Sequence, residues 1–154
     1  DKFKNQWSNG KILWMCNKLI RKTLYDKVPY VQRRYVEDTP TIVRQLWYAN
    51  KVVVVNNTGY FHRLVTTSIC HNVKPIDDAI YKSMCWCDLV EFFLENDKSI
   101  LQNTNLLGTI GDLLEQLNSL DVTEEELKPY EHDYCNTVSR IFKLIKITNI
   151  DLKI

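Results

Sequence analysis

The sequence predicts a mostly α-helical protein with small β-hairpins. Apolar residues recur at helical spacing through most of the 154 residues, as they do in helices that bury one face. Two stretches, residues 51–65 and 145–154, change to strand-like patterns, and each follows a set of short helical segments. Short helices followed by a hairpin are the sequence outline of a winged helix. We therefore expect two tandem winged-helix units, residues 1–70 and a more divergent unit at residues 74–154, with one α+β domain in which both hairpins share a sheet as the alternative.

The composition is that of a packed globular protein with an uneven charge distribution. Apolar residues make up 45% of the chain, which is ample for a core. The net charge is only +1, but basic residues dominate between Lys11 and Arg63, and acidic residues dominate between Asp112 and Asp133. This asymmetry suggests that the first half contacts an acidic partner.

The start of the chain and its cysteines indicate whether it is part of a longer protein and in which redox compartment it works. The sequence begins at Asp1 without a methionine, a signal segment or an apolar run long enough to span a bilayer. We therefore expect a piece of a longer soluble protein. Five cysteines at irregular spacing favour a reducing, intracellular compartment over a disulfide framework.

Two helices are expected at the start of the first unit. Ser8 or Asn9 caps the first of them, and its apolar residues recur at helical spacing up to Leu24. Pro29 ends this helix because proline disrupts a helix interior. Residues 30–36 are then long enough for a short second helix.

A third helix, with stronger signals, comes next. Thr39 is a good N-cap and Pro40 suits the first helical position. The helix ends near Asn50, and the first hairpin follows it directly. The apolar stripe of the helix is expected to comprise Ile42, Val43, Leu46 and Trp47.

The first hairpin has three parts. Val52–Val55 form a β-branched strand, the tetrad Asn56–Gly59 favours a turn, and residues 60–65 form an aromatic-rich second strand.

The second unit is predicted to begin with a long helix. Pro75 suits its first position and two aspartates follow in the first turn. Thr109 is expected to cap a further helix with four apolar residues on one side. The inner stripe of the long helix is expected to comprise Ile76, Ile80, Cys87, Val90 and Leu94.

The second unit ends with two helices and a hairpin. Thr123 and Glu126 have the spacing of a capping box for a short helix. A final helix follows Pro129, with Tyr134, Val138, Ile141, Phe142 and Ile145 at helical intervals. The period then changes to two, so residues 145–154 are expected to form a small terminal hairpin.

This order of elements resembles the C-terminal region of the Stn subunit of the CST telomere complex, the counterpart of the middle subunit of replication protein A. The resemblance covers nearly the whole chain. It depends on the strand Lys51–Val55, the Asn-Asn-Thr-Gly turn and the strand Tyr60–Val65, followed by a polar link and a second helical bundle. It implies an OB-fold before this region and winged helices that dock proteins: the large subunit, the polymerase α-primase machinery or telomerase-associated factors.

The candidate binding residues lie on the third helix and the first hairpin. Arg44 and Gln45 can donate paired hydrogen bonds to phosphate or base edges, and Tyr48 can stack. An ordinary solvated helix face and a structural wing without a ligand are the alternatives. The full set is Thr41, Arg44, Gln45, Tyr48, Lys51, Asn57, His62 and Arg63. A possible interface anchor, with burial in the core as the favoured interpretation, comprises Trp86, Phe92 and Phe93.

No catalytic or metal-binding motif is predicted. Cys85 and Cys87 are separated by one residue, whereas paired thiolate ligands usually have a gap of two. The three histidines have no serine, cysteine or carboxylate at a spacing that indicates a triad. We expect no cofactor and no small-molecule substrate.

These observations predict a non-catalytic interaction module of a telomere-maintenance complex, located in the nucleus at chromosome ends. Its partners would be protein subunits of a telomere or replication complex, with at most weak contact to DNA and none to membranes. One alternative is a winged-helix domain that binds duplex DNA in a transcription or replication-initiation factor. A third hypothesis, a viral or regulatory helical adaptor, would lack the hairpins altogether.

Overall fold

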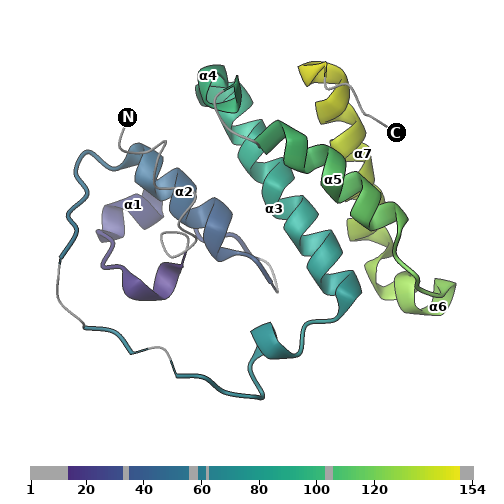
Figure 1. The fold of residues 1–154 in the computed structure, drawn as a ribbon. Coiled ribbons are helices and arrows are strands. Elements are labelled where there is room, and N and C mark those ends of the chain that lie inside the picture. Colours follow the sequence, from purple (N-terminus) through teal and green to yellow (C-terminus); the bar gives the residue numbers. More distant parts are fainter. Residues whose placement is uncertain (1–13, 33–34, 56–58, 62, 103–105, 150–154) are drawn as a thin grey trace. The chain divides into compact units, whose positions relative to one another are not determined.

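The computed structural model divides the chain into two compact units, residues 1–73 and 74–154, and each is described by itself (Figure 1). The residues that the structure describes are 14–32, 35–55, 59–61, 63–102 and 106–149.

The first unit is built from short helices around a small core. In chain order these are η2 (Met15–Asn17), α1 (Lys22–Lys27), α2 (Asp38–Tyr48) and η3 (Ile69–His71). Both η2 and α1 pack on α2. Its buried apolar side chains are few: within the described part of this unit they are Val28, Pro40, Ile42 and Val43.

The single long helix expected before Pro29 is wrong over the described residues. The backbone is extended at Lys18 and Arg21, so η2 and α1 are separate turns. Leu19, which was expected on the apolar stripe, is fully exposed. Because short helices are held mainly by packing of their apolar face, the exposed stripe leaves the chain free to extend between the two turns.

The short helix expected at residues 30–36 is also absent where the structure describes that stretch. Val36 instead adopts a left-handed conformation with φ 57°, which is costly for a β-branched residue. The Tyr30 hydroxyl donates to Asp38 Oδ1 at 2.6 Å and to Glu37 Oε1 at 3.2 Å. These bonds connect the turn to the first residues of α2, which begins one residue before the predicted cap Thr39.

Neither expected hairpin is present in the part of the chain that the structure describes. No strand occurs in any residue that the structure describes. The described residues between Ala49 and Val73 form an irregular chain after α2, with η3 as their regular element (Figure 1). At the other end of the protein, α7 continues to Thr148, Asn149 caps it in a left-handed conformation, and residues 150–154 lie outside the described residues.

The fold-class prediction is therefore correct in being mostly α and wrong in its hairpins, and tandem winged helices are not observed. A two-stranded hairpin is marginal unless a helix or a further strand covers its apolar face. The small core of the first unit provides no such cover for Val52–Val55, whose side chains are exposed. The alternative with one shared sheet fails for the same reason, since no described residue is in a strand.

The second unit is a bundle of three main helices. These are α3 (Pro75–Asn96), α5 (Leu106–Asn118) and α7 (Glu131–Thr148), and each packs on the other two. Figure 1 shows them side by side. The connections contain α4 (Lys98–Gln102), α6 (Glu124–Leu127) and η4 (Lys128–Tyr130).

The core of the bundle follows the predicted helical stripes on two of the three helices. On α3, Ile76, Ile80, Cys87 and Val90 are buried as expected, and Leu94 is partly buried. Phe92 and Phe93 are also buried, with ring centroids 5.3 Å apart, so they belong to the core. On α5, which begins at Leu106 rather than after Thr109, the buried side chains are Leu106, Ile110, Leu113, Leu114 and Leu117.

On α7 the predicted stripe is correct at Ile141 and wrong at Phe142, so the buried face is rotated relative to the predicted one. Thr137, Ile141 and Leu144 are buried, whereas Phe142 is exposed. Burial of the polar Thr137 is possible because its hydroxyl donates to the Asp133 carbonyl at 2.6 Å. A pattern of apolar residues alone could not indicate that a threonine would face the core.

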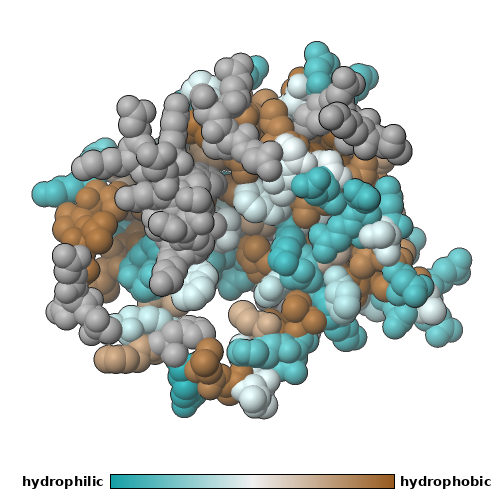
Figure 2. Space-filling view, in the orientation of Figure 1, coloured by the Kyte–Doolittle hydropathy of each residue, from teal (hydrophilic) through white to brown (hydrophobic). Residues whose placement is uncertain are grey.

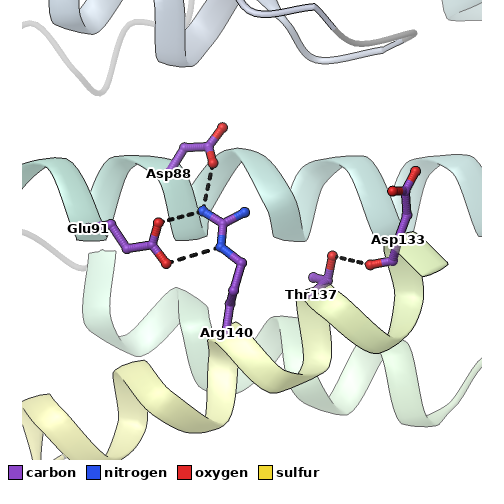
Figure 3. A network of polar contacts seen from close by, with 5 residues as sticks. All are labelled: Asp88, Glu91, Asp133, Thr137 and Arg140. Carbon is purple, nitrogen blue, oxygen red and sulfur yellow. Dashed lines mark hydrogen bonds and ion pairs between the residues drawn. The ribbon is translucent and has the colours of Figure 1, made fainter.

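Two polar features stabilise the bundle. The predicted capping box is confirmed, since Thr123 Oγ1 accepts from the Glu126 amide and the Glu126 carboxylate accepts from the Thr123 amide. In addition, Arg140 on α7 reaches two carboxylates of α3 (Figure 3). Its guanidinium donates to Asp88 Oδ1 and to both Glu91 oxygens at 2.7 to 3.0 Å.

The ion network is substantially shielded from water. Side-chain exposure is 19% for Arg140 and 12% for Asp88. Burial by itself lowers the pKa of Arg140, but the hydrogen bonds that it donates to Glu91 and Asp88 outweigh this effect, so the net pKa is raised above the ordinary value. Arg140 therefore stays charged and joins α3 to α7.

Among the helices of the described residues, none combines the length and the apolar character needed to cross a membrane.

Candidate functional site

The most unusual surface of the first unit is a run of four exposed valines, Val52–Val55, called here the valine segment. Their exposed fractions are 59, 67, 79 and 71%. Figure 2 shows hydrophobic atoms where the chain leaves α2. Single exposed apolar side chains are ordinary, but a contiguous run of them makes this segment a candidate interaction site.

Further exposed apolar side chains follow the valine segment along the chain. They are Tyr60, Phe61, Leu64 and Ile69. A Cβ atom built on Gly59 would meet no atom within 4 Å, so the surroundings there are open. The Tyr60 hydroxyl forms a hydrogen bond with Cys16, which raises the pKa of Tyr60 above its ordinary value.

The outer face predicted for α2 is wrong at two of its four residues. Thr41 is completely buried and Gln45 is 2% exposed. The Thr41 hydroxyl donates to the Glu37 carbonyl at 2.8 Å and accepts from the Val31 amide at 3.1 Å. Gln45 Nε2 donates to the Val28 carbonyl at 3.3 Å. These side chains hold the loop before α2 and cannot contact a partner.

The other two residues of that face are half-buried. Arg44 and Tyr48 both have partial exposure, and the Lys27 ammonium lies 4.1 Å from the centroid of the Tyr48 ring. This cation–π contact joins α1 to the end of α2. The predicted stacking role of Tyr48 would require that contact to open.

The predicted residues of the wing do not form one site. Lys51 and Arg63 are exposed, one just before the valine segment and one twelve residues later. Asn57 and His62 lie outside the described residues. The structure therefore does not bring the eight predicted residues together in one site. The valine segment lies between Lys51 and Arg63 in the sequence, and it was predicted only as a strand.

The signal for this site was present in the sequence. A strand with one buried face alternates apolar and polar residues, whereas four consecutive valines place apolar side chains on both faces. Such a run needs cover on two sides, which an edge hairpin of a small unit does not supply.

The two units have opposite charge. Residues 1–73 contain twelve Lys and Arg against four Asp and Glu, a net charge of +8. Residues 74–154 contain eight against fifteen, a net charge of −7. The valine segment therefore belongs to a strongly basic unit, which attracts acidic surfaces and repels a second copy of itself.

Groups with catalytic potential are dispersed. Within the described ranges, no three His, Cys, Asp or Glu side chains lie close enough to hold a metal ion. His132 is exposed, and its Nδ1 lies 3.4 Å from Asp133 Oδ1 on the neighbouring residue. His71 is exposed in η3. Burial, with a hydrogen bond to Asp38, raises the pKa of Tyr30, which keeps that hydroxyl protonated as a structural donor.

Comparison of the chain with family models, curated proteins and solved structures finds no match.

Proposed function

We propose that this chain is a non-catalytic protein-interaction module and that it docks a partner protein through the valine segment. The observation that carries the proposal is the exposure of four consecutive β-branched side chains on a basic unit. Burying one valine fully contributes roughly 1.5 kcal/mol or more, so four supply on the order of 6 kcal/mol before the cost of ordering the chain. Association itself costs roughly 4 kcal/mol or more, so the valines supply part of the driving force and the partner must add further favourable contacts.

The proposed partners are protein subunits of a telomere or replication complex, in the nucleus, as the resemblance implies. That resemblance depended in part on the first hairpin, so the partner class is a separate proposal from the docking function. A pull-down with the full chain, followed by identification of the retained proteins, tests the partner class. Retention of polymerase α-primase or telomere-complex subunits supports it, and retention only of unrelated proteins contradicts it.

The docking function is tested by replacing the four valines with threonine in the full chain. Threonine keeps the shape and the β-branching of valine but exposes a hydroxyl, so the driving force for burial is lost. Partner retention should fall at least tenfold while the helical circular dichroism stays unchanged. The matched control is Phe142→Ser, which removes an exposed apolar side chain from the second unit and should retain the partner normally.

Duplex DNA binding has less support. The helix face that was to contact DNA contains Thr41 and Gln45, which are buried. A duplex-binding protein that neutralises several phosphates would show a log-log salt slope of about 0.9 per phosphate. We expect weak duplex binding that is equal in the wild type and in Arg44→Ala.

A further inference from the structure

We propose that the valine segment binds by strand addition: it pairs with the open edge of a β-sheet in an acidic partner protein. This rests on the docking function proposed above and specifies its mode and the chemistry of its partner. The partner would provide main-chain hydrogen bonds to the segment, together with apolar contacts to both of its faces.

Burying the valine segment also affects its backbone groups. Covering the valine side chains also removes the adjacent N–H and C=O groups from water, and such groups must then be hydrogen-bonded. No strand or helix in the described part of the chain includes these four residues. In the proposed mode the partner supplies these hydrogen bonds, and an open sheet edge is the protein surface that offers a matching row of donors and acceptors.

The valine segment is suited to an extended conformation. Four consecutive β-branched residues disfavour a helix and favour an extended chain, because their χ1 angles are restricted. Ala49, where α2 ends, is already extended with φ −77° and ψ 122°. The segment therefore enters a strand at little conformational cost, whereas docking as an amphipathic helix would lack both propensity and a polar face.

The charge of the first unit indicates what kind of protein the valine segment pairs with. The first unit has a net charge of +8 and exposes Lys51 and Arg63 on either side of the segment. Two copies that paired their valine segments would bring two such units together, which is unfavourable. The acidic second unit of another copy offers no strand within residues 74–102 and 106–149. A different protein with an acidic rim around its sheet edge fits both the charge and the hydrogen bonding.

The experiment is a proline scan of the full chain, with the variants Val52→Pro, Val53→Pro, Val54→Pro and Val55→Pro. The probe is the purified protein that the wild type retains and the four-threonine variant loses. Successive amides of an added strand point alternately to the partner and away from it, and proline removes the donor. Two alternate variants should therefore lose at least tenfold in affinity, and the other two should stay within about threefold of the wild type.

Electrostatics supply the second readout. Affinity should fall as salt is raised from low to high ionic strength, and Lys51→Glu with Arg63→Glu should lower the association rate at low salt. The matched control is Lys82→Glu in the second unit, which should leave association unchanged. Both tests use exposed residues or a partly exposed lysine, so the fold should be preserved in each.

The possible failures are distinguishable. If the four-threonine variant binds as well as the wild type, the docking function itself is wrong. If it loses binding but the four proline variants show no alternation, docking stands and strand addition is overturned. A probe without a β-sheet, or an affinity insensitive to salt, also overturns this inference. Alternation in the proline scan together with salt sensitivity supports it.

Discussion

Replacing Arg140 with methionine should destabilise the helical bundle. The Arg140 guanidinium bridges Asp88 and Glu91 of α3 from its position on α7 (Figure 3). Methionine retains the apolar stem and removes the charge, so two neighbouring carboxylates lose their common partner. Their mutual repulsion and the loss of three hydrogen bonds both favour the unfolded chain.

The magnitude follows from the burial of the three side chains. Breaking a fully buried ion pair by removing one partner costs about 3 to 5 kcal/mol. Here Arg140 is 19% exposed and Glu91 is 38% exposed, so water screens part of the loss. We therefore expect a decrease of about 2 kcal/mol in the free energy of unfolding for Arg140→Met. Arg140→Lys keeps the charge but not the paired geometry, and about 1 kcal/mol is expected.

The assay is urea unfolding followed by helical circular dichroism, which is dominated by α3, α5 and α7. The control combines Arg140→Met with Asp88→Asn and Glu91→Gln, which removes the isolated negative charges. This triple variant should recover at least half of the loss, because the neutral amides repel each other far less. An unchanged midpoint for Arg140→Met, or a triple variant less stable than the single one, would refute the proposed role of the network.

Three further predictions concern single positions. Thr41→Val should lower the stability of the first unit by about 1 to 2 kcal/mol in urea unfolding, since it removes a buried hydroxyl with two hydrogen bonds; no change would place Thr41 on the surface. The capping box lowers the pKa of Glu126, so NMR titration should show it below that of an ordinary glutamate and Thr123→Val should raise it. The associated stabilisation is present above the unfolded pKa of Glu126 and is lost as pH falls through the lowered folded value; a pKa that Thr123→Val leaves unchanged would contradict this. Ile141→Ala should cost about 2 to 5 kcal/mol and Phe142→Ala less than about 1 kcal/mol, and the reverse order would mean that α7 is rotated.

Local signals in the sequence predicted most helices of the second unit well, but not its end, where α7 continues to Thr148 in place of a hairpin. Pro75 at the helix start, the capping box at Thr123 and the stripe on α3 depend on residues within a few turns of one another. The rotation of α7 was not predicted, because Thr137 enters the core through a bond to its own helix. Capping and periodicity are local properties, whereas the choice between two adjacent faces is made by the neighbouring helices.

The first unit was predicted poorly because its structure depends on tertiary contacts. Thr41 and Gln45 are polar residues on a helix, and sequence rules place them in solvent. They are buried because they satisfy backbone groups of the preceding loop, near Val28 and Val31. Likewise, Val52–Val55 have the propensity of a strand, but a strand requires a partner, which the sequence pattern does not specify.

The most direct test of the account is amide hydrogen exchange of the free protein, with Val52–Val55 as the observed residues. If the valine segment docks by strand addition, these four amides form no ladder hydrogen bonds until a partner binds. They should exchange at nearly the rate of an unfolded peptide, while the amides of Leu89 and Val90 in buried α3 exchange slowly. Slow exchange at alternate valines in the free protein would mean that the segment is already paired in a hairpin, and would contradict both the observed fold and the proposed mode of docking.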